Sequence, residues 1–105
     1  MTYDYGAIVA LADPTRRAVF EMVAVRPRSV AELTRALPVT QSAVSQHLKV
    51  LREARLVRSD QVGTRNIYRL DPQGLDQMRK WLDGMWTEAL ASFATELEKS
   101  EEEGQ

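Results

Sequence analysis

The sequence predicts a mostly α-helical domain that carries a two-stranded β wing. Three observations support this fold class. Apolar residues recur at helical spacing in several segments, two short helical patterns within residues 30–57 meet at a proline-containing turn, and residues 58–70 have the pattern of a hairpin around a glycine. The expected order is four helices, two strands and a last helix, which is the order of a winged helix-turn-helix domain.

Composition limits the classes of protein that the chain can form. Its 105 residues are enough for one domain with one modest core, and the absence of cysteine excludes disulfides and thiol chemistry. The apolar runs are far too short to cross a membrane, and the residues after Met1 lack the pattern of a signal peptide. We expect a cytoplasmic protein without a membrane partner, with one domain over residues 1–99 and a disordered acidic tail over residues 100–105.

Charge is distributed unevenly along the chain, although the net charge is only −1. Residues 13–69 contain 11 Lys or Arg and 5 Asp or Glu, a net charge of +6. Residues 70–105 contain 3 and 9, a net charge of −6, and Asp4 supplies the remaining negative charge. A polyanion would be steered toward the middle of the chain and away from its end. A solvated charged surface is the alternative.

The first two helices are expected over Tyr3–Ala12 and from Pro14 to about Val25. Asp13 can cap the second helix, and proline suits the first turn of a helix, where no N–H is needed. The expected core residues of this helix are Val19, Phe20 and Val23. The helix should stop at Arg26, because the residue before a proline disfavours helix.

The third and fourth helices form the predicted helix-turn-helix. Ser29 and Glu32 have the spacing of a capping box at the start of the third helix. Pro38 makes the turn, and Thr40 caps a fourth helix that runs from Gln41 to about Arg55. At 100° per residue, the core-facing stripe of the fourth helix consists of Val44, Leu48 and Leu51.

The opposite side of the fourth helix carries side chains that suit a DNA major groove. Glutamine can pair with the edge of adenine, serine can donate or accept, and lysine and arginine reach guanine or phosphate. The candidate DNA contacts on this helix are Gln41, Ser42, Ser45, Gln46, Lys49 and Arg52. Polar residues that are merely solvated are the alternative, but the capped helix before them and the basic hairpin after them favour DNA binding.

The wing is expected from two strands, Leu56–Gln61 and Arg65–Leu70, around a turn where Gly63 allows a positive φ. Thr64 and Arg65 lie at its tip, where they are placed to reach a phosphate or the minor groove. Basic hairpin residues also discourage edge pairing between sheets, and that is the alternative role.

The last helix, from about Pro72 to Lys99, carries an apolar stripe wider than packing on its own domain needs. Such a helix packs on a partner as well, so we expect a homodimer. The candidate interface residues, from this helix and the first one, are Tyr5, Ile8, Leu82, Met85, Trp86, Ala89 and Phe93. A single internal core and a ligand pocket lined by the two tryptophans are the alternatives.

Three segments resemble the ArsR/SmtB family of bacterial winged-helix regulators: Leu11–Arg17, Ser42–Ala54 and Leu56-Val57. The resemblance covers about Ile8 to Leu70. It implies a homodimer whose first and last helices form the interface, whose fourth helices enter successive major grooves of a palindromic operator, and which represses transcription by occluding that operator. Family members usually have glycine where this chain has Arg55, after the fourth helix, so a left-handed residue is expected there.

Much of this family senses metals, through cysteines in the third helix or histidine with carboxylates in the last. This chain has no cysteine, and His47, its only histidine, lies in the fourth helix between core and groove. Carboxylates alone make a poor tetrahedral zinc site. The resemblance is therefore to the metal-independent members, and we expect no metal site, no cofactor and an inducer that the sequence does not identify.

These observations favour a sequence-specific, DNA-binding transcriptional regulator, a homodimeric repressor of its own or neighbouring genes with double-stranded DNA as its target. An enzyme is not expected, because the chain has no nucleophile–base arrangement, no glycine-rich phosphate loop and no metal-ligand spacing. A winged-helix module for protein contact and a repressor that responds to a small organic ligand at the dimer seam are the alternatives.

Overall fold

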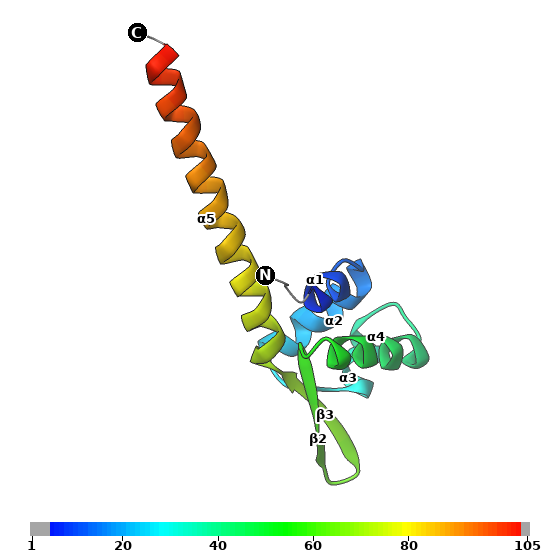
Figure 1. Cartoon of the computed structure of the whole chain (residues 1–105). Coiled ribbons are helices and arrows are strands. Elements are labelled where there is room, and N and C mark those ends of the chain that lie inside the picture. Colours follow the sequence, from blue (N-terminus) through cyan, green and yellow to red (C-terminus); the bar gives the residue numbers. More distant parts are fainter. Residues whose placement is uncertain (1–4, 104–105) are drawn as a thin grey trace.

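A computed structural model describes residues 5–103 of the chain. The elements are α1 (Gly6–Ala10), α2 (Pro14–Val25), β1 (Arg28–Ser29), α3 (Val30–Ala36), α4 (Gln41–Glu53), β2 (Val57–Val62), β3 (Arg65–Leu70) and α5 (Pro72–Glu103). The four shorter helices form a body, from which α5 and the β2–β3 hairpin project on opposite sides (Figure 1). The predicted fold class and element order are confirmed, with one additional strand.

The helix caps read from the sequence are present. The Asp13 carboxylate accepts a hydrogen bond from the Arg16 N–H at 2.9 Å, and the Thr40 hydroxyl accepts one from the Ala43 N–H at 3.1 Å. Ser29 caps α3 in the same way. α2 has its predicted bounds and buries its three predicted side chains.

α1 is shorter than the predicted Tyr3–Ala12, of which residues 3 and 4 lie outside the described range. It ends at Ala10 because the chain turns there, and two arginines of α2 bind the carbonyls at the turn. Arg16 Nε donates to the Ala10 carbonyl at 2.6 Å, and Arg17 Nη1 donates to the Leu11 carbonyl at 3.2 Å. These bonds satisfy C-terminal carbonyls that a longer helix would use itself.

The core lies between α2, α3, α4 and the base of the hairpin. The α4 stripe is confirmed, since Val44, Leu48 and Leu51 are each 0% exposed. The other fully buried side chains are Leu33, Leu56, Val19, Val23 and Val57. Because this stripe is fully buried, the rotation of α4 about its axis is fixed. The opposite side of the helix therefore faces solvent.

The sheet has three antiparallel strands in the order β1-β3-β2, where the sequence predicted two strands. β1 pairs Arg28 with Tyr68 and Ser29 with Ile67. Two residues are too short to show the alternation that predicts a strand, and their partner is distant in sequence. The hairpin turn matches the prediction, because Gly63 has φ +63°.

α5 packs its start against the end of α4. Arg55 has φ +59°, and the Leu56 N–H bonds to the Leu51 carbonyl at 3.0 Å, as in a Schellman motif. The Gly74 N–H then bonds to the Arg55 carbonyl at 2.8 Å. A Cβ at Gly74 would lie 2.6 Å from the Ala54 carbonyl oxygen, so only glycine permits this approach. We call this contact the α4–α5 joint.

The far end of α5 differs from the prediction. The helix continues to Glu103, so residues 100–103 of the expected disordered tail are helical, and residues 104–105 lie outside the described range. Glutamate favours helix, and the first helix-breaking residue after Lys99 is a glycine at position 104. Within residues 5–103, no helix is both long and apolar enough to cross a membrane.

Candidate DNA-binding surface

The outer side of α4 presents the six polar and basic side chains predicted to contact DNA. All are exposed: Gln41, Ser42, Ser45, Gln46, Lys49 and Arg52. They form one face because the opposite stripe is fully buried. Within the described residues, the side chains of Lys49 and Arg52 make no hydrogen bond or ion pair with the rest of the protein. Their charges are therefore available to phosphates or bases.

Most other arginines of the basic middle segment are bound to the protein's own chain. Their partners are backbone carbonyls, carboxylates, the Ser29 hydroxyl and the Gln73 side chain. The arginines bound in this way are Arg16, Arg17, Arg26, Arg28, Arg55, Arg65 and Arg69. Within residues 5–103, the basic side chains of this segment without such a bond are Arg35, Lys49, Arg52 and Arg58. These arginines keep their charge, but a bond within the protein sets the position of each guanidinium. Fewer basic side chains of the segment are therefore free to reach toward DNA than the sequence suggests.

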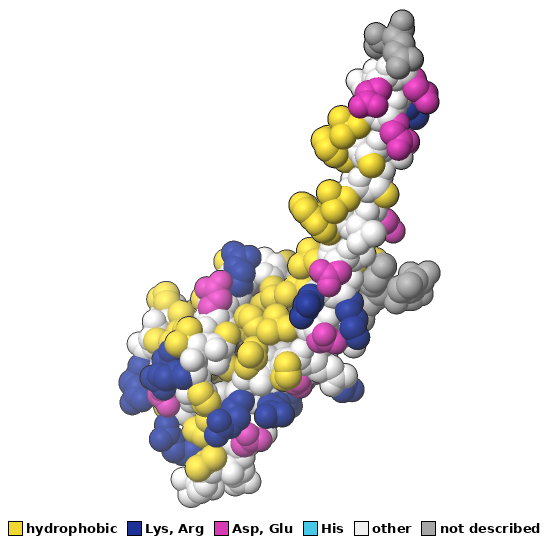
Figure 2. All heavy atoms as spheres, turned by 90° about the vertical axis from the view of Figure 1, so that its left-hand side faces the viewer, with side chains coloured by type: hydrophobic (Ala, Val, Ile, Leu, Met, Phe, Trp, Pro, Cys, Tyr) yellow, Lys and Arg dark blue, Asp and Glu magenta, His cyan; other side chains and the backbone are white. Residues whose placement is uncertain are grey.

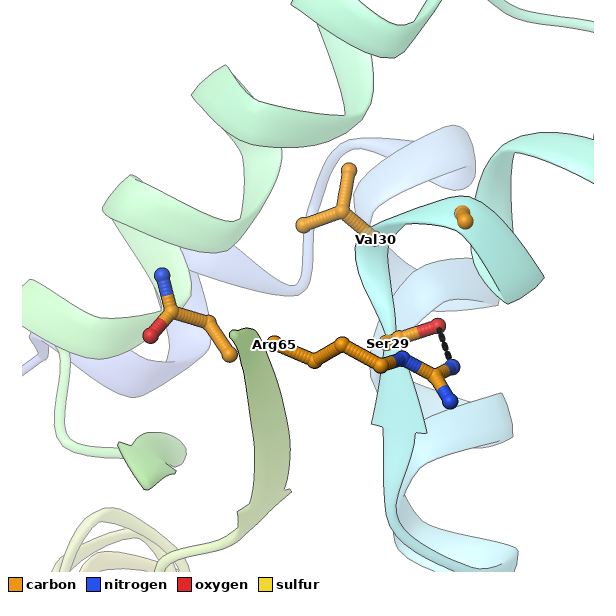
Figure 3. A pocket seen from close by; sticks show the side chains of 5 residues that line it. Ser29, Val30 and Arg65 are labelled. Atoms are coloured by element: carbon orange, nitrogen blue, oxygen red, sulfur yellow. Dashed lines mark hydrogen bonds between the residues drawn. The ribbon is translucent and has the colours of Figure 1, made fainter. Parts of the chain in front are cut away.

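Arg65 illustrates the difference between sequence position and side-chain position. Its backbone lies next to the wing turn, as predicted, but its guanidinium reaches back to the start of α3 (Figure 3). Nη2 donates to the Ser29 hydroxyl at 2.9 Å and to a Glu32 carboxylate oxygen at 3.4 Å. Ser29, Arg65 and their neighbours border a small pocket of about 180 Å³. Thr64, at the turn itself, is exposed.

Two carboxylates at helix starts have pKa values below their ordinary range. The pKa of Glu32 is lowered mainly by the hydrogen bond from Arg26, the nearer of its two guanidinium partners, and further by Ser29. The pKa of Asp13 is lowered mainly by the Arg16 N–H, with a smaller effect of the nearby His47. Both groups therefore remain ionised at neutral pH.

The chain has few nitrogen and sulfur side chains that bind metals, with one histidine and no cysteine. His47 is half-buried on α4. Across residues 5–103, no three or more His, Cys, Asp or Glu side chains are grouped so that they could hold a metal ion.

The predicted dimer residues form an apolar surface on α5 and α1. Figure 2 shows hydrophobic side chains that cover the face of the body beside α5 and continue along one side of the helix. Trp86 is 68% exposed and Phe93 62%. Tyr5 is half exposed and packs its ring edge-on against Trp81, with centroids 6.2 Å apart. The remaining predicted residues are exposed or, for Ile8, half-buried.

Two more exposed residues, Leu90 and Leu97, continue this surface and were not among the predicted interface residues, although their spacing matches. We call the α5 part of the surface the α5 ridge. It consists of Leu82, Met85, Trp86, Ala89, Leu90, Phe93 and Leu97.

Residues 13–59, which hold α2, α3 and α4, match the sequence profile of the family described as bacterial regulatory protein, arsR family. The chain is 56% identical over 85 residues to the HTH-type transcriptional regulator Rv2034 of Mycobacterium tuberculosis, covering 81% of this chain and 79% of that protein. It is 44% identical over 59 residues to a transcriptional repressor SmtB homolog of Synechocystis sp., covering 56% and 44%. The fold matches the crystal structure of a possible transcriptional regulator for arsenical resistance with a TM-score of 0.70 and 38% identity, covering 86% and 94%.

Proposed function

The chain belongs to the bacterial arsR family of regulatory proteins and is a DNA-binding transcriptional regulator, and we propose that it acts as a homodimeric repressor. The two α4 helices of the dimer read successive major grooves of a palindromic operator, about 34 Å apart. The observation that carries this proposal is α4 itself, whose buried stripe holds a polar and basic face toward solvent, with one acidic residue, Glu53, at the far end. A protein that binds an operator works where the DNA is, so the proposal includes a cytoplasmic location.

The roles on the DNA follow from side-chain chemistry. Gln46 and Gln41 read base edges, because an amide pairs with both edge atoms of adenine. Ser42 and Ser45 bond to bases or to phosphates, while Lys49 and Arg52 bind phosphate or guanine. The tip of the wing, with Thr64, approaches the neighbouring minor groove.

The dimer forms through α1 and the α5 ridge. A monomer would leave this continuous apolar surface in water, which soluble monomers rarely do. In a two-fold dimer the ridge meets its own copy, so each exposed side chain is covered by both subunits. The hairpin and α5 project on opposite sides of the body, so the acidic end of the chain stays away from DNA phosphates (Figure 1).

Repression and independence from metals are further parts of the proposal. One relative is named a transcriptional repressor, and a dimer bound across an operator blocks access to it. The chain supplies no cysteine and a single histidine as metal donors. A zinc site needs three or four nitrogen, sulfur or oxygen ligands in tetrahedral geometry, for which this donor set is poor.

An apolar groove supports a second candidate, in which a small organic molecule at the dimer seam controls DNA binding. The groove, of about 370 Å³, lies between α1 and the end of α4, with Val9, Ala10, Val50 and Ala54 in its lining. A thermal-shift screen of apolar compounds tests this candidate. Binders should raise the melting temperature of the natural protein but not that of Val50→Trp, which fills the groove.

The main experiment compares the protein's own upstream DNA with scrambled DNA across a salt series, with and without a chelator. We expect a specificity ratio above about 10³ and no effect of the chelator. Gln46→Ala should reduce operator affinity by roughly tenfold and leave scrambled DNA unaffected. Gln77→Ala on α5 is the matched control and should bind as the natural protein does. Equal loss on both DNAs would remove Gln46 from base reading, and equal binding of both by the natural protein would contradict the proposal.

A further inference from the structure

The outer half of the wing has little to hold it against the body. β1 pairs with β3 only as far as Ile67, so the hairpin beyond it is a two-stranded ribbon. Residues 60–66 are all exposed. A two-stranded ribbon without a packed face is only marginally stable, and its direction relative to the body is easily changed.

Arg65 is the link between this ribbon and the helix-turn-helix. Its Nη2 bonds to the Ser29 hydroxyl at 2.9 Å and to Glu32 at 3.4 Å, across 36 and 33 positions of sequence. Figure 3 shows the extended side chain crossing from β3 to the start of α3. In the described part of the chain, no other side chain of residues 59–66 makes a hydrogen bond or ion pair outside the hairpin.

The groups that receive Arg65 are themselves fixed. Ser29 is only 4% exposed, belongs to β1, and accepts the Glu32 N–H at 3.2 Å as the N-cap of α3. The Glu32 carboxylate is held by Arg26 at 3.0 Å and by the Ser29 hydroxyl at 3.4 Å. Glu32 thus pairs with two arginines, and Arg65 is bound to residues that other contacts of the domain hold in place.

We propose that Arg65 is a positioning residue for the wing, which ties the outer hairpin to the capping box of α3 through Ser29 and Glu32. The contact sets the direction of the hairpin relative to α4, and operator affinity depends on it without a bond from Arg65 to DNA. This role replaces the phosphate contact expected from sequence. It rests on the proposed function only where DNA affinity is concerned, because the tie itself is a property of the free protein.

Three variants of the full chain test the tie: Arg65→Ala, Glu32→Gln and the double variant. Glutamine keeps the capping function at the third position of a helix, so Glu32→Gln should fold normally. The first readout is amide hydrogen exchange of the free protein. We expect faster exchange of residues 59–66 by about three- to tenfold in Arg65→Ala and in the double variant, and a smaller increase in Glu32→Gln, with an unchanged melting temperature. Glu21→Gln, an exposed glutamate of α2, and Arg58→Ala, a hairpin arginine without an outside bond, should leave exchange unchanged.

The second readout is operator affinity over a salt series. Arg65→Ala and the double variant should weaken binding by the same factor, about three- to tenfold, because both remove the whole tie. Glu32→Gln should weaken binding less, because the shorter bond from Arg65 to the Ser29 hydroxyl remains. The slope of log affinity against log salt should stay unchanged, since no phosphate contact is lost. A slope flattened by about one unit in Arg65→Ala, or tighter binding by Glu32→Gln, would overturn the proposal in favour of a phosphate contact.

The two readouts separate the two proposals. Unchanged hydrogen exchange in Arg65→Ala overturns the tie, whatever the DNA result. Faster exchange in a protein that binds no DNA supports the tie and contradicts the proposed function.

Discussion

α4 and α5 have the same kind of apolar pattern, but the stripe is buried in α4 and exposed in most of α5. Both have apolar residues at helical spacing along one side. The α4 stripe is 0% exposed, because α2, α3 and the base of the hairpin cover it. The α5 ridge is about half exposed or more, since only the first turns of α5, at Leu75 and Met78, pack on the domain's own core. An apolar stripe thus forms a core where the chain supplies a counter-surface and an interaction surface where it does not.

This difference separates two sources of stability. The α4 stripe contributes to the folding of each chain, whereas the α5 ridge contributes only when a second surface covers it. Substitutions in the two helices should therefore differ in their dependence on protein concentration.

The largest expected effect is at Leu48 of α4, which is 0% exposed. Leu48→Ala removes buried methyl groups and leaves a cavity in the centre of the domain, at a cost of about 2–5 kcal/mol in the free energy of unfolding. Urea denaturation followed by circular dichroism measures the loss. A cost below about 1 kcal/mol would mean that the core closes around the smaller side chain.

The second effect is at Trp86 of the α5 ridge, which is 68% exposed in the single chain. Trp86→Ala should leave helix content unchanged but raise the dissociation constant of the dimer more than about 30-fold, because a two-fold interface loses the ring from both subunits. Analytical ultracentrifugation over a concentration series measures it. Glu88→Ala, outside the ridge, is the matched control. A variant that dimerises as the natural chain does would place the interface elsewhere.

The same two helices show what sequence could and could not predict. α2 and α4 were found with their buried side chains, since a cap and a 3.6-residue period are local signals. β1 was missed because its pairing with Tyr68 and Ile67 is a tertiary contact of two residues. The exposure of the six residues on the outer side of α4 agrees with the predicted DNA contacts, but their contact with DNA stays a prediction.

The partners of the arginine side chains, unlike the helix caps, could not be predicted from sequence patterns. Arg65 was placed correctly at the wing tip, yet its guanidinium finds acceptors more than 30 positions away. Arg16 and Arg17 likewise donate to backbone carbonyls at the end of α1, which the sequence did not predict. A long side chain can bond to any acceptor that the fold brings close to it. The periodicity of the sequence does not indicate which acceptor that will be.

The third-largest expected effect is at Gly74, where the start of α5 contacts the end of α4. Gly74→Ala adds a Cβ that would lie 2.6 Å from the Ala54 carbonyl oxygen and 2.7 Å from that of Arg55, so the start of α5 must move away from α4. We expect a loss of about 1–2 kcal/mol in the free energy of unfolding, because the strain exceeds the gain in helix propensity. Thermal unfolding measures the change. Higher stability would mean that α5 shifts without strain, and the joint would not fix its direction.

The smallest effect is at the other side of the α4–α5 joint. Arg55 has φ +59°, where a non-glycine residue costs about 1 kcal/mol relative to glycine. Arg55→Gly removes this strain and also the exposed hydrogen bond from Arg55 Nη1 to Gln73 at 3.1 Å, which contributes little. The melting temperature should therefore rise slightly, and Gln73→Ala, which removes only the hydrogen bond, measures the offset. An unchanged or lower melting temperature would show that the left-handed turn is not strained. A more stable Arg55→Gly variant with weaker operator binding would instead mean that the chain keeps a strained arginine at the joint to bind DNA.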